Sequence, residues 1–121
     1  MNEEQSFFIS VLNLIPVGSF LFIQAPSLEV ESILNVMKET ENEYFKSIEL
    51  TPENKRLLIN EIKLGNFQNY IHLTEIRHNK QLLFQGFDGV EFGIISNRIS
   101  LPKEFILKYI NDNFCSISKD W

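Results

Sequence analysis

The chain has a single cysteine, Cys115, among its 121 residues. One cysteine cannot form a disulfide within the chain, and this usage is typical of proteins kept in a reducing compartment. A free cysteine usually behaves as a small buried apolar residue, and we interpret Cys115 in that way rather than as a reactive thiol. The length suits one domain with one hydrophobic core, so residues 1–121 are predicted to form a single globular domain.

Long hydrophobic runs are also missing. The two longest apolar segments, residues 7–15 and 19–25, are too short to cross a bilayer and are separated by Pro16 and Gly18. The chain begins Met-Asn-Glu-Glu, whereas a secretory signal begins with positive charge followed by an apolar run. We therefore expect no membrane partner and a cytoplasmic location.

The sequence lacks the motifs that carry catalysis or nucleotide binding. It contains no Gly-x-Ser-x-Gly, no Gly-x-Gly-x-x-Gly and no Gly-Lys-Ser. Its two histidines, His72 and His78, fall on one expected strand and its turn. A rise of roughly 3.3 Å per residue separates them by about 20 Å, which is too far to share a zinc ion. We predict that the protein is not an enzyme and uses no cofactor or metal.

Positive charge is scarce in one segment only. Residues 29–53 hold seven acidic and two basic residues, while the rest of the chain holds nine of each, so the whole net charge of −5 resides in that segment. Nucleic-acid binding requires a basic surface, and a nucleic-acid partner is therefore disfavoured. The acidic segment either attracts a basic protein or is the solvated face of a helix.

The first part of the chain combines helical and extended patterns. Residues 3–14 place apolar side chains at helical spacing before Pro16 and Gly18, which predicts a helix with one aromatic face. A strand near residues 18–24 follows, because its apolar run is too short for a helix. Since that run is continuous, we expect a central strand covered on both faces.

Two more helices are predicted before residue 66. Ser27 can cap the first of them, and its apolar stripe consists of Val30, Ile33, Leu34 and Met37. The second begins at Thr51-Pro52 and ends at Gly65. The residues between them are interpreted as a continuation of the earlier helix over part of 39–50, with an extended piece at 47–50.

Residues 69–96 have a β pattern that predicts a meander. One turn is expected at residues 78–80 and another at Asp88-Gly89. A two-residue type I′ turn at Asp88-Gly89 pairs Gln85 with Phe92. Both faces of this hairpin are mostly apolar, so helices are expected to cover at least part of each.

The end of the chain predicts one more helix and a strand. The helix opens at Leu101-Pro102, and the strand lies within residues 115–118. The fold class that follows is α+β, in a single domain. A mainly antiparallel sheet, with the meander at about 69–96 and a strand near 18–24, is expected to pack against three to four helices.

Asp88 and Glu91 flank the expected tight turn and offer two neighbouring carboxylates. Such a pair can serve a hydrolase, with His72 as a third group, or hold a divalent metal. The structural alternative is that Asp before Gly satisfies the turn and that Glu91 is solvated. We favour the structural alternative.

A resemblance to a known family is carried by the run Leu83-Phe84-Gln85-Gly86-Phe87-Asp88-Gly89-Val90-Glu91-Phe92-Gly93-Ile94-Ile95-Ser96. Leu101-Pro102 with Phe105 and Tyr109, and Cys115-Ser116-Ile117-Ser118, extend it. This part of the chain resembles the C-terminal half of small bacterial immunity proteins, in particular those of contact-dependent growth inhibition systems. The resemblance implies a cytoplasmic protein that binds the C-terminal toxin domain of a delivered exoprotein, often a nuclease, and blocks it.

The charge pattern indicates where such a partner would bind. Nuclease toxins tend to be basic, and an acidic surface both accelerates the encounter and competes for the same contacts. Glu39, Glu41 and Glu43 are the candidate steering charges, and Tyr44 and Phe45 are the adjacent aromatic anchors. A second candidate surface combines the hairpin tip with the chain end and consists of Asp88, Glu91, Asp120 and Trp121.

One further class stays open from the sequence. A small adaptor could dimerise through an exposed strand edge, and its binding would respond little to salt. The sequence does not indicate the oligomeric state.

Overall fold

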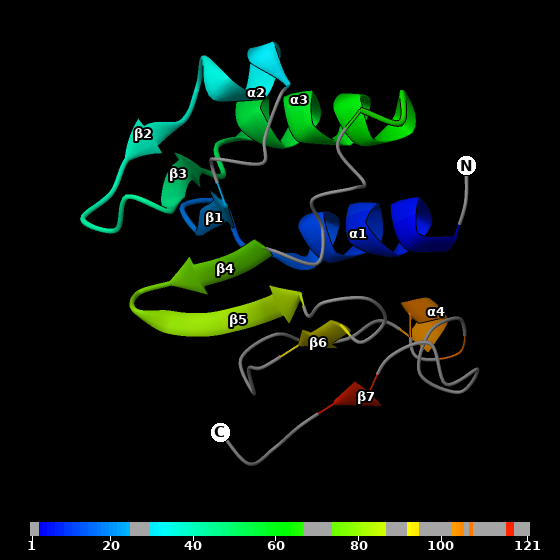
Figure 1. The fold of residues 1–121 in the computed structure, drawn as a ribbon. Helices are drawn as coiled ribbons and strands as arrows, with labels where there is room; N and C mark the ends of the chain where they lie inside the picture. Colours follow the sequence, from blue (N-terminus) through cyan, green and yellow to red (C-terminus); the bar gives the residue numbers. More distant parts are fainter. Residues whose placement is uncertain are drawn as a thin grey trace.

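The computed structural model describes residues 3–24, 30–66, 74–86, 92–94, 103–105, 107 and 116–117. Within them, the strands form one seven-stranded sheet in the order β2-β3-β1-β4-β5-β6-β7 (Figure 1). The pairs are antiparallel except for β6 and β7, which run parallel. The predicted α+β class with a mainly antiparallel sheet is confirmed.

The elements have the following bounds. The helices are α1 (Glu3–Leu14), α2 (Glu31–Leu34), α3 (Pro52–Lys63) and α4 (Lys103–Phe105). The strands are β1 (Phe20–Gln24), β2 (Lys38–Glu39), β3 (Phe45–Glu49), β4 (Thr74–His78), β5 (Gln81–Gly86), β6 (Phe92–Ile94) and β7 (Ser116–Ile117). None of the helices in the described ranges is long and apolar enough to cross a membrane.

The hydrophobic core lies between one face of the sheet and the first three helices. Helices α1 and α3 pack against each other beside the sheet (Figure 1). The core draws Leu21 and Ile23 from β1, Ile48 from β3 and Ile76 from β4. Leu21 is opposite both Ile48 and Ile76, so these side chains share one face. The helices add Phe7, Phe8, Val11, Leu12, Ile33, Leu58 and Ile62.

Helix α3 begins and ends where its sequence predicts. The Thr51 hydroxyl oxygen accepts a hydrogen bond from the Asn54 amide at 3.1 Å, and Pro52 occupies the first turn, where its missing N–H costs nothing. Gly65 follows the helix with a φ of 80°, a conformation that glycine adopts without steric cost. The predicted helix over residues 3–14 is likewise confirmed as α1.

The prediction for residues 30–50 was wrong in its middle part. Helix α2 is a single turn after Val30, and residues 38–49 form the β2–β3 hairpin instead of a continued helix. The reason is local hydrogen bonding, because the Thr40 and Asn42 side chains bond to the backbone two residues further on and so stabilise a turn. Ser27, the predicted cap, lies outside the described residues.

Strand β1 is central, as predicted, but it is not covered on both faces. It pairs with β3 on one side and β4 on the other. Leu21 and Ile23 are fully buried, whereas Phe20 is 42% exposed and Phe22 is half-buried. The continuous apolar run therefore concealed an alternation: within the described ranges, α1, α2 and α3 pack on the face that carries Leu21 and Ile23.

The β5–β6 hairpin is shifted by one residue from the predicted register. Gln85 pairs with Gly93 instead of Phe92, and Gly86 pairs with Phe92. The predicted register, which placed Gln85 opposite Phe92, is therefore wrong. A shift of one residue exchanges the two faces of the strand. Asp88 and Gly89 themselves lie outside the described residues.

The last part of the chain matches the predicted order of elements where it is described. Helix α4 stands between β6 and β7, and β7 confirms the strand expected within residues 115–118. The parallel pairing of β7 with β6 requires such a crossover. Residues 69–73 of the predicted meander and most of the predicted last helix, including Tyr109, fall outside the described residues, as does Cys115.

Lys55 of α3 ties that helix to the end of α1. Its Nζ donates a hydrogen bond to the backbone carbonyl of Ile15, the residue that follows α1. Carbonyls at a helix C-terminus lack intrahelical partners and favour a cation. Burial lowers the pKa of the Lys55 ammonium below its ordinary value of 10.5.

We expect Lys55→Met to lower the free energy of unfolding by about 1–2 kcal/mol, because the Ile15 carbonyl loses a charged donor. Because the pKa of Lys55 is lower in the folded chain than in the unfolded chain, the unfolded chain binds this proton more tightly. The free energy of unfolding of the wild type therefore increases as the pH rises through the range just below 10.5. Lys55→Met should remove that increase. Urea unfolding at pH 7 and pH 10 measures both effects, and Arg56→Met, on the exposed side of the same helix, is the control. An equal decrease in the free energy of unfolding in the two variants would contradict a stabilising role of the Lys55–Ile15 hydrogen bond.

Candidate functional site

The β2–β3 hairpin brings together the first set of residues predicted for partner binding. Glu39 ends β2, Glu41 and Glu43 stand in the connecting loop, and Tyr44 and Phe45 lead into β3. We call residues 40–44 the acidic loop. The second predicted set, Asp88, Glu91, Asp120 and Trp121, lies outside the described residues.

Side-chain hydrogen bonds hold the acidic loop in one shape. The Thr40 hydroxyl oxygen accepts from the Asn42 amide at 3.1 Å, and the hydroxyl lies 2.8 Å from the carbonyl oxygens of both Asn42 and Phe45, to which it can donate. The Asn42 side-chain oxygen accepts from the Tyr44 amide at 2.9 Å. The loop therefore presents its acidic residues from a fixed backbone, which lowers the entropy lost on binding.

The acidic residues of the hairpin differ in how their charge is balanced. Glu39 lies 3.5 Å from the Lys46 ammonium, in a solvent-exposed pair of the kind that contributes little stability. Glu41 and Glu43 are exposed, and neither carboxylate has a partner among the described residues. Tyr44 beside them is 57% exposed. Two unbalanced negative charges thus lie at the tip of the hairpin, and the exposed Glu49 carboxylate at the far end of β3 likewise has no partner among the described residues.

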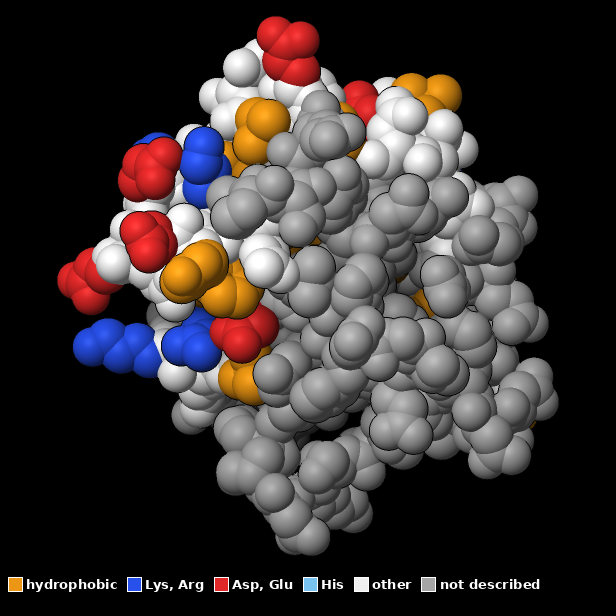
Figure 2. Space-filling view, viewed as in Figure 1, with side chains coloured by type: hydrophobic (Ala, Val, Ile, Leu, Met, Phe, Trp, Pro, Cys, Tyr) orange, Lys and Arg blue, Asp and Glu red, His pale blue; other side chains and the backbone are white. Residues whose placement is uncertain are grey.

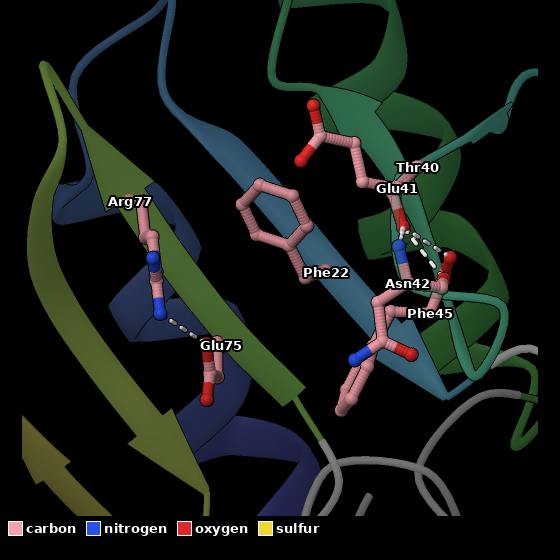
Figure 3. A pocket seen from close by; sticks show the side chains of 7 residues that line it. All are labelled: Phe22, Thr40, Glu41, Asn42, Phe45, Glu75 and Arg77. Carbon is pink, nitrogen blue, oxygen red and sulfur yellow. Dashed lines mark hydrogen bonds and ion pairs between the residues drawn. The ribbon is translucent and has the colours of Figure 1, made fainter.

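A hollow of about 490 Å³ lies between the acidic loop and the face of the sheet that the helices leave uncovered. We call it the Phe22 hollow. Its described lining residues are Phe22, Thr40, Glu41, Asn42, Phe45, Glu75 and Arg77. In Figure 3 the Phe22 side chain stands between Arg77 of β4 and Glu41 of the acidic loop.

Strand register explains why these residues meet. Phe22 on β1 is opposite Glu75 on β4 and Ser47 on β3, and Gln24 is opposite Phe45. Residues opposite each other on neighbouring strands share a face. Sequence reasoning missed Phe22, Glu75 and Arg77 as site residues. The signal that could have found them is the alternation of buried and exposed side chains along residues 20–24 and 74–78. In residues 20–24 the continuous apolar run concealed that alternation.

Arg77 has two partners at the wall of the hollow. Its guanidinium lies 3.0 Å from the Glu75 carboxylate and 5.8 Å from the centre of the Phe22 ring. Both distances are within the range of favourable ion-pair and cation–π contact. The charges of Arg77 and Glu75 therefore balance each other at the hollow.

A second hollow of about 380 Å³ lies on the other side of Arg77, and we call it the Lys80 hollow. Its described lining residues are Gly18, Phe20, Phe22, Arg77, Asn79 and Lys80. Asn79 and Lys80 form the β4–β5 turn with positive φ values of 50° and 66°. The two hollows share Phe22 and Arg77 but differ in charge, because the Phe22 hollow adds Glu41 and Glu75 and the Lys80 hollow adds Lys80. Figure 2 shows hydrophobic side chains lying among acidic and basic ones at this end of the molecule.

Ser19 and His78 form the one serine–histidine contact within the described ranges. The Ser19 hydroxyl donates to the Pro16 carbonyl at 2.8 Å, and its oxygen lies 3.3 Å from His78 Nδ1. Since the serine proton is used by Pro16, Nδ1 is the donor to the serine oxygen. Ser19 is also fully buried, so the pair holds the end of β4 against the turn before β1 and does not present a nucleophile. His78 is half-buried and is the last residue of β4.

The sequence offered Asp88 and Glu91, with His72, as a possible hydrolase or metal site. These three residues lie outside the described residues. Among the residues that are described, no group of three His, Cys, Asp or Glu side chains is placed to hold a metal ion.

We expect Thr40→Val to loosen the acidic loop while leaving the sheet folded, because valine keeps the shape but loses the hydroxyl that joins Asn42 and Phe45. Hydrogen exchange of the Asn42 amide should become about fivefold faster or more, as the loss of a hydrogen bond worth about 1 kcal/mol implies. Thr40→Ser keeps the hydroxyl and should exchange close to the wild-type rate. Unchanged exchange in Thr40→Val would show that the hydroxyl does not hold the loop.

Comparisons with known proteins found no match to the chain among family models, curated proteins or solved structures.

Proposed function

We propose that this protein is an immunity protein that binds a cognate bacterial toxin domain directly and neutralises it. The toxin domain is basic, in keeping with a nuclease that binds phosphates. The observation that carries the proposal is the acidic loop, where Glu41 and Glu43 stand exposed, unpaired among the described residues and next to the exposed Tyr44.

The charges and the aromatic residues have different tasks in this proposal. Exposed carboxylates at a hairpin tip act over a distance of about one Debye length and raise the rate of encounter with a basic surface. Tyr44 and Phe45 supply contact area once the surfaces meet, since aromatic residues dominate interface energies. The complex forms in the cytoplasm, where a delivered nuclease meets its substrate.

The adaptor alternative, dimerisation through a strand edge, is weakened at the β2 edge. Strand β2 is only two residues long, and both Lys38 and Glu39 are charged and exposed. Short, charged edge strands are a common means of preventing edge-to-edge pairing. The β2–β3 hairpin is thus better suited to a partner that recognises its tip than to a second copy that extends the sheet.

The proposal is tested by co-expression with the C-terminal domain of the protein encoded by the immediately upstream gene. Two outcomes are required: the two proteins purify as a complex, and this protein restores growth to cells that produce the domain. Purification without growth protection would contradict neutralisation, and an upstream metabolic enzyme that neither binds nor inhibits growth would contradict the whole assignment.

We expect the double variant Glu41→Lys, Glu43→Lys to slow association with that domain by about tenfold or more at low salt, because the steering charge is reversed where the partner approaches. Stopped-flow or surface-based kinetics at two ionic strengths measure the effect, which should shrink as salt rises.

The matched control is Glu31→Lys, Glu53→Lys, which changes the net charge by the same amount at exposed positions outside the acidic loop. If this control slowed association as much as the loop variant did, the overall charge and not the acidic loop would steer the partner. Thermal unfolding of both variants verifies that each remains folded.

A further inference from the structure

The side chains that line the Phe22 hollow are of the kinds that form a cation-binding site. Two aromatic rings, Phe22 and Phe45, and two carboxylates, Glu41 and Glu75, line a volume of about 490 Å³. This volume is in the range of sites that hold small ligands or anchoring side chains. Because Phe22 and Phe45 are both only half-buried, their surfaces are accessible from the hollow.

The charges of the lining residues determine whether a cation or an anion is the favoured ligand. Arg77 is balanced by Glu75 at 3.0 Å, while Glu41 has no partner in the part of the chain that is described. The described lining therefore carries one unbalanced negative charge. An anion would approach Glu41 without compensation, whereas a cation would satisfy it.

Arg77 already illustrates the contacts that a guest would make. Its guanidinium combines a carboxylate, Glu75, with the ring of Phe22 at 5.8 Å. The opposite wall offers a similar combination, because Glu41 stands on the other side of Phe22 (Figure 3). A guanidinium fits this arrangement better than an ammonium, since it is planar, stacks on aromatic rings and is less strongly hydrated.

We propose that the Phe22 hollow binds an arginine side chain of the partner, with the guanidinium between Glu41 and the aromatic rings of Phe22 and Phe45. The source of the arginine rests on the proposed function, because a basic toxin domain supplies it. The chemistry of the seat does not depend on that source. The fixed backbone of the acidic loop positions Glu41 before the guest arrives.

The Lys80 hollow provides an internal contrast. It shares Phe22 and Arg77 but has Lys80 in place of Glu41, so its charged lining residues are both basic among those described. A cation should therefore enter the Phe22 hollow and avoid its neighbour, although both contain aromatic surface.

The test is an NMR titration of the intact protein with N-acetyl-arginine amide. Saturable shifts are expected at the amides of Glu41, Asn42 and Glu75, and little change is expected at Asn79 and Lys80. N-acetyl-citrulline amide has the same shape without the charge and should bind about fivefold more weakly or worse, because it loses the attraction to Glu41 and to the rings. Glu41→Gln should weaken arginine binding about threefold, and Glu31→Gln should leave it unchanged.

Three results would overturn the proposal. Citrulline could bind as well as arginine, the shifts could fail to saturate or could centre on Asn79 and Lys80, or Glu41→Gln could bind arginine as tightly as the wild type does. N-acetyl-lysine amide is the third probe, and equal binding of it would overturn the assignment to arginine in favour of a site for any cation.

The outcomes separate this proposal from the proposed function. If arginine amide fails to bind while charge reversal at Glu41 and Glu43 still slows association with the toxin domain, the acidic loop steers the partner but the hollow does not bind an arginine side chain. If arginine amide binds as described while the upstream gene product does not form a complex, the seat stands and the toxin partner is wrong.

Discussion

The pairing of β1 with a neighbour on each side is the constraint on which the rest of the structure depends. Leu21 is fixed opposite Ile48 on one side and Ile76 on the other, and these residues form the middle of the sheet's contribution to the core, to which Ile23 and Leu83 also belong. A slip of one residue in either pairing would turn the core residues of one of the two strands, Leu21 and Ile23 or those of its neighbour, away from the helices. Burial of an aliphatic side chain contributes about 1.5–3 kcal/mol, so several such losses would exceed the stability of a small domain.

The same constraint determines what lies on the opposite face. Once Leu21 and Ile23 point into the core, Phe20 and Phe22 must point away from it. The register then places Phe22 opposite Glu75, with Arg77 two residues further along β4. The Phe22 hollow is therefore a consequence of core packing, because it collects residues from three chain segments whose positions the core fixes.

Local signals allowed much of the helical structure to be predicted. Thr51-Pro52 and Gly65 bound α3 because caps act over a few residues and are visible in any sequence. The β2–β3 hairpin was missed because glutamate-rich segments favour helices by propensity, and only the turn chemistry of Thr40 and Asn42 argued against one. The β5–β6 register was predicted one residue away from the observed one, because the prediction was derived from the Asp-Gly pair taken as a two-residue turn.

The candidate site could be predicted only in part, for a physical reason of the same kind. The acidic residues and their aromatic neighbours are contiguous in sequence, so Glu41, Glu43 and Tyr44 were found. Glu75 and Arg77 reach the site through pairing of β4 with β1, and nothing in a single sequence states which strands pair.

Charge pairing elsewhere on the sheet explains why the acidic loop carries the electrostatic signal. Glu39 is paired with Lys46 and Glu75 with Arg77, so these exposed pairs cancel at a distance and add little to stability. Glu41 and Glu43 are not cancelled in this way by any residue that the structure describes, and the side-chain hydrogen bonds that hold the loop come from Thr40 and Asn42. Under the proposed function, carboxylates that have no partner in the described part of the chain are available for binding, and at the tip of an exposed hairpin they would attract a basic surface before any contact is made.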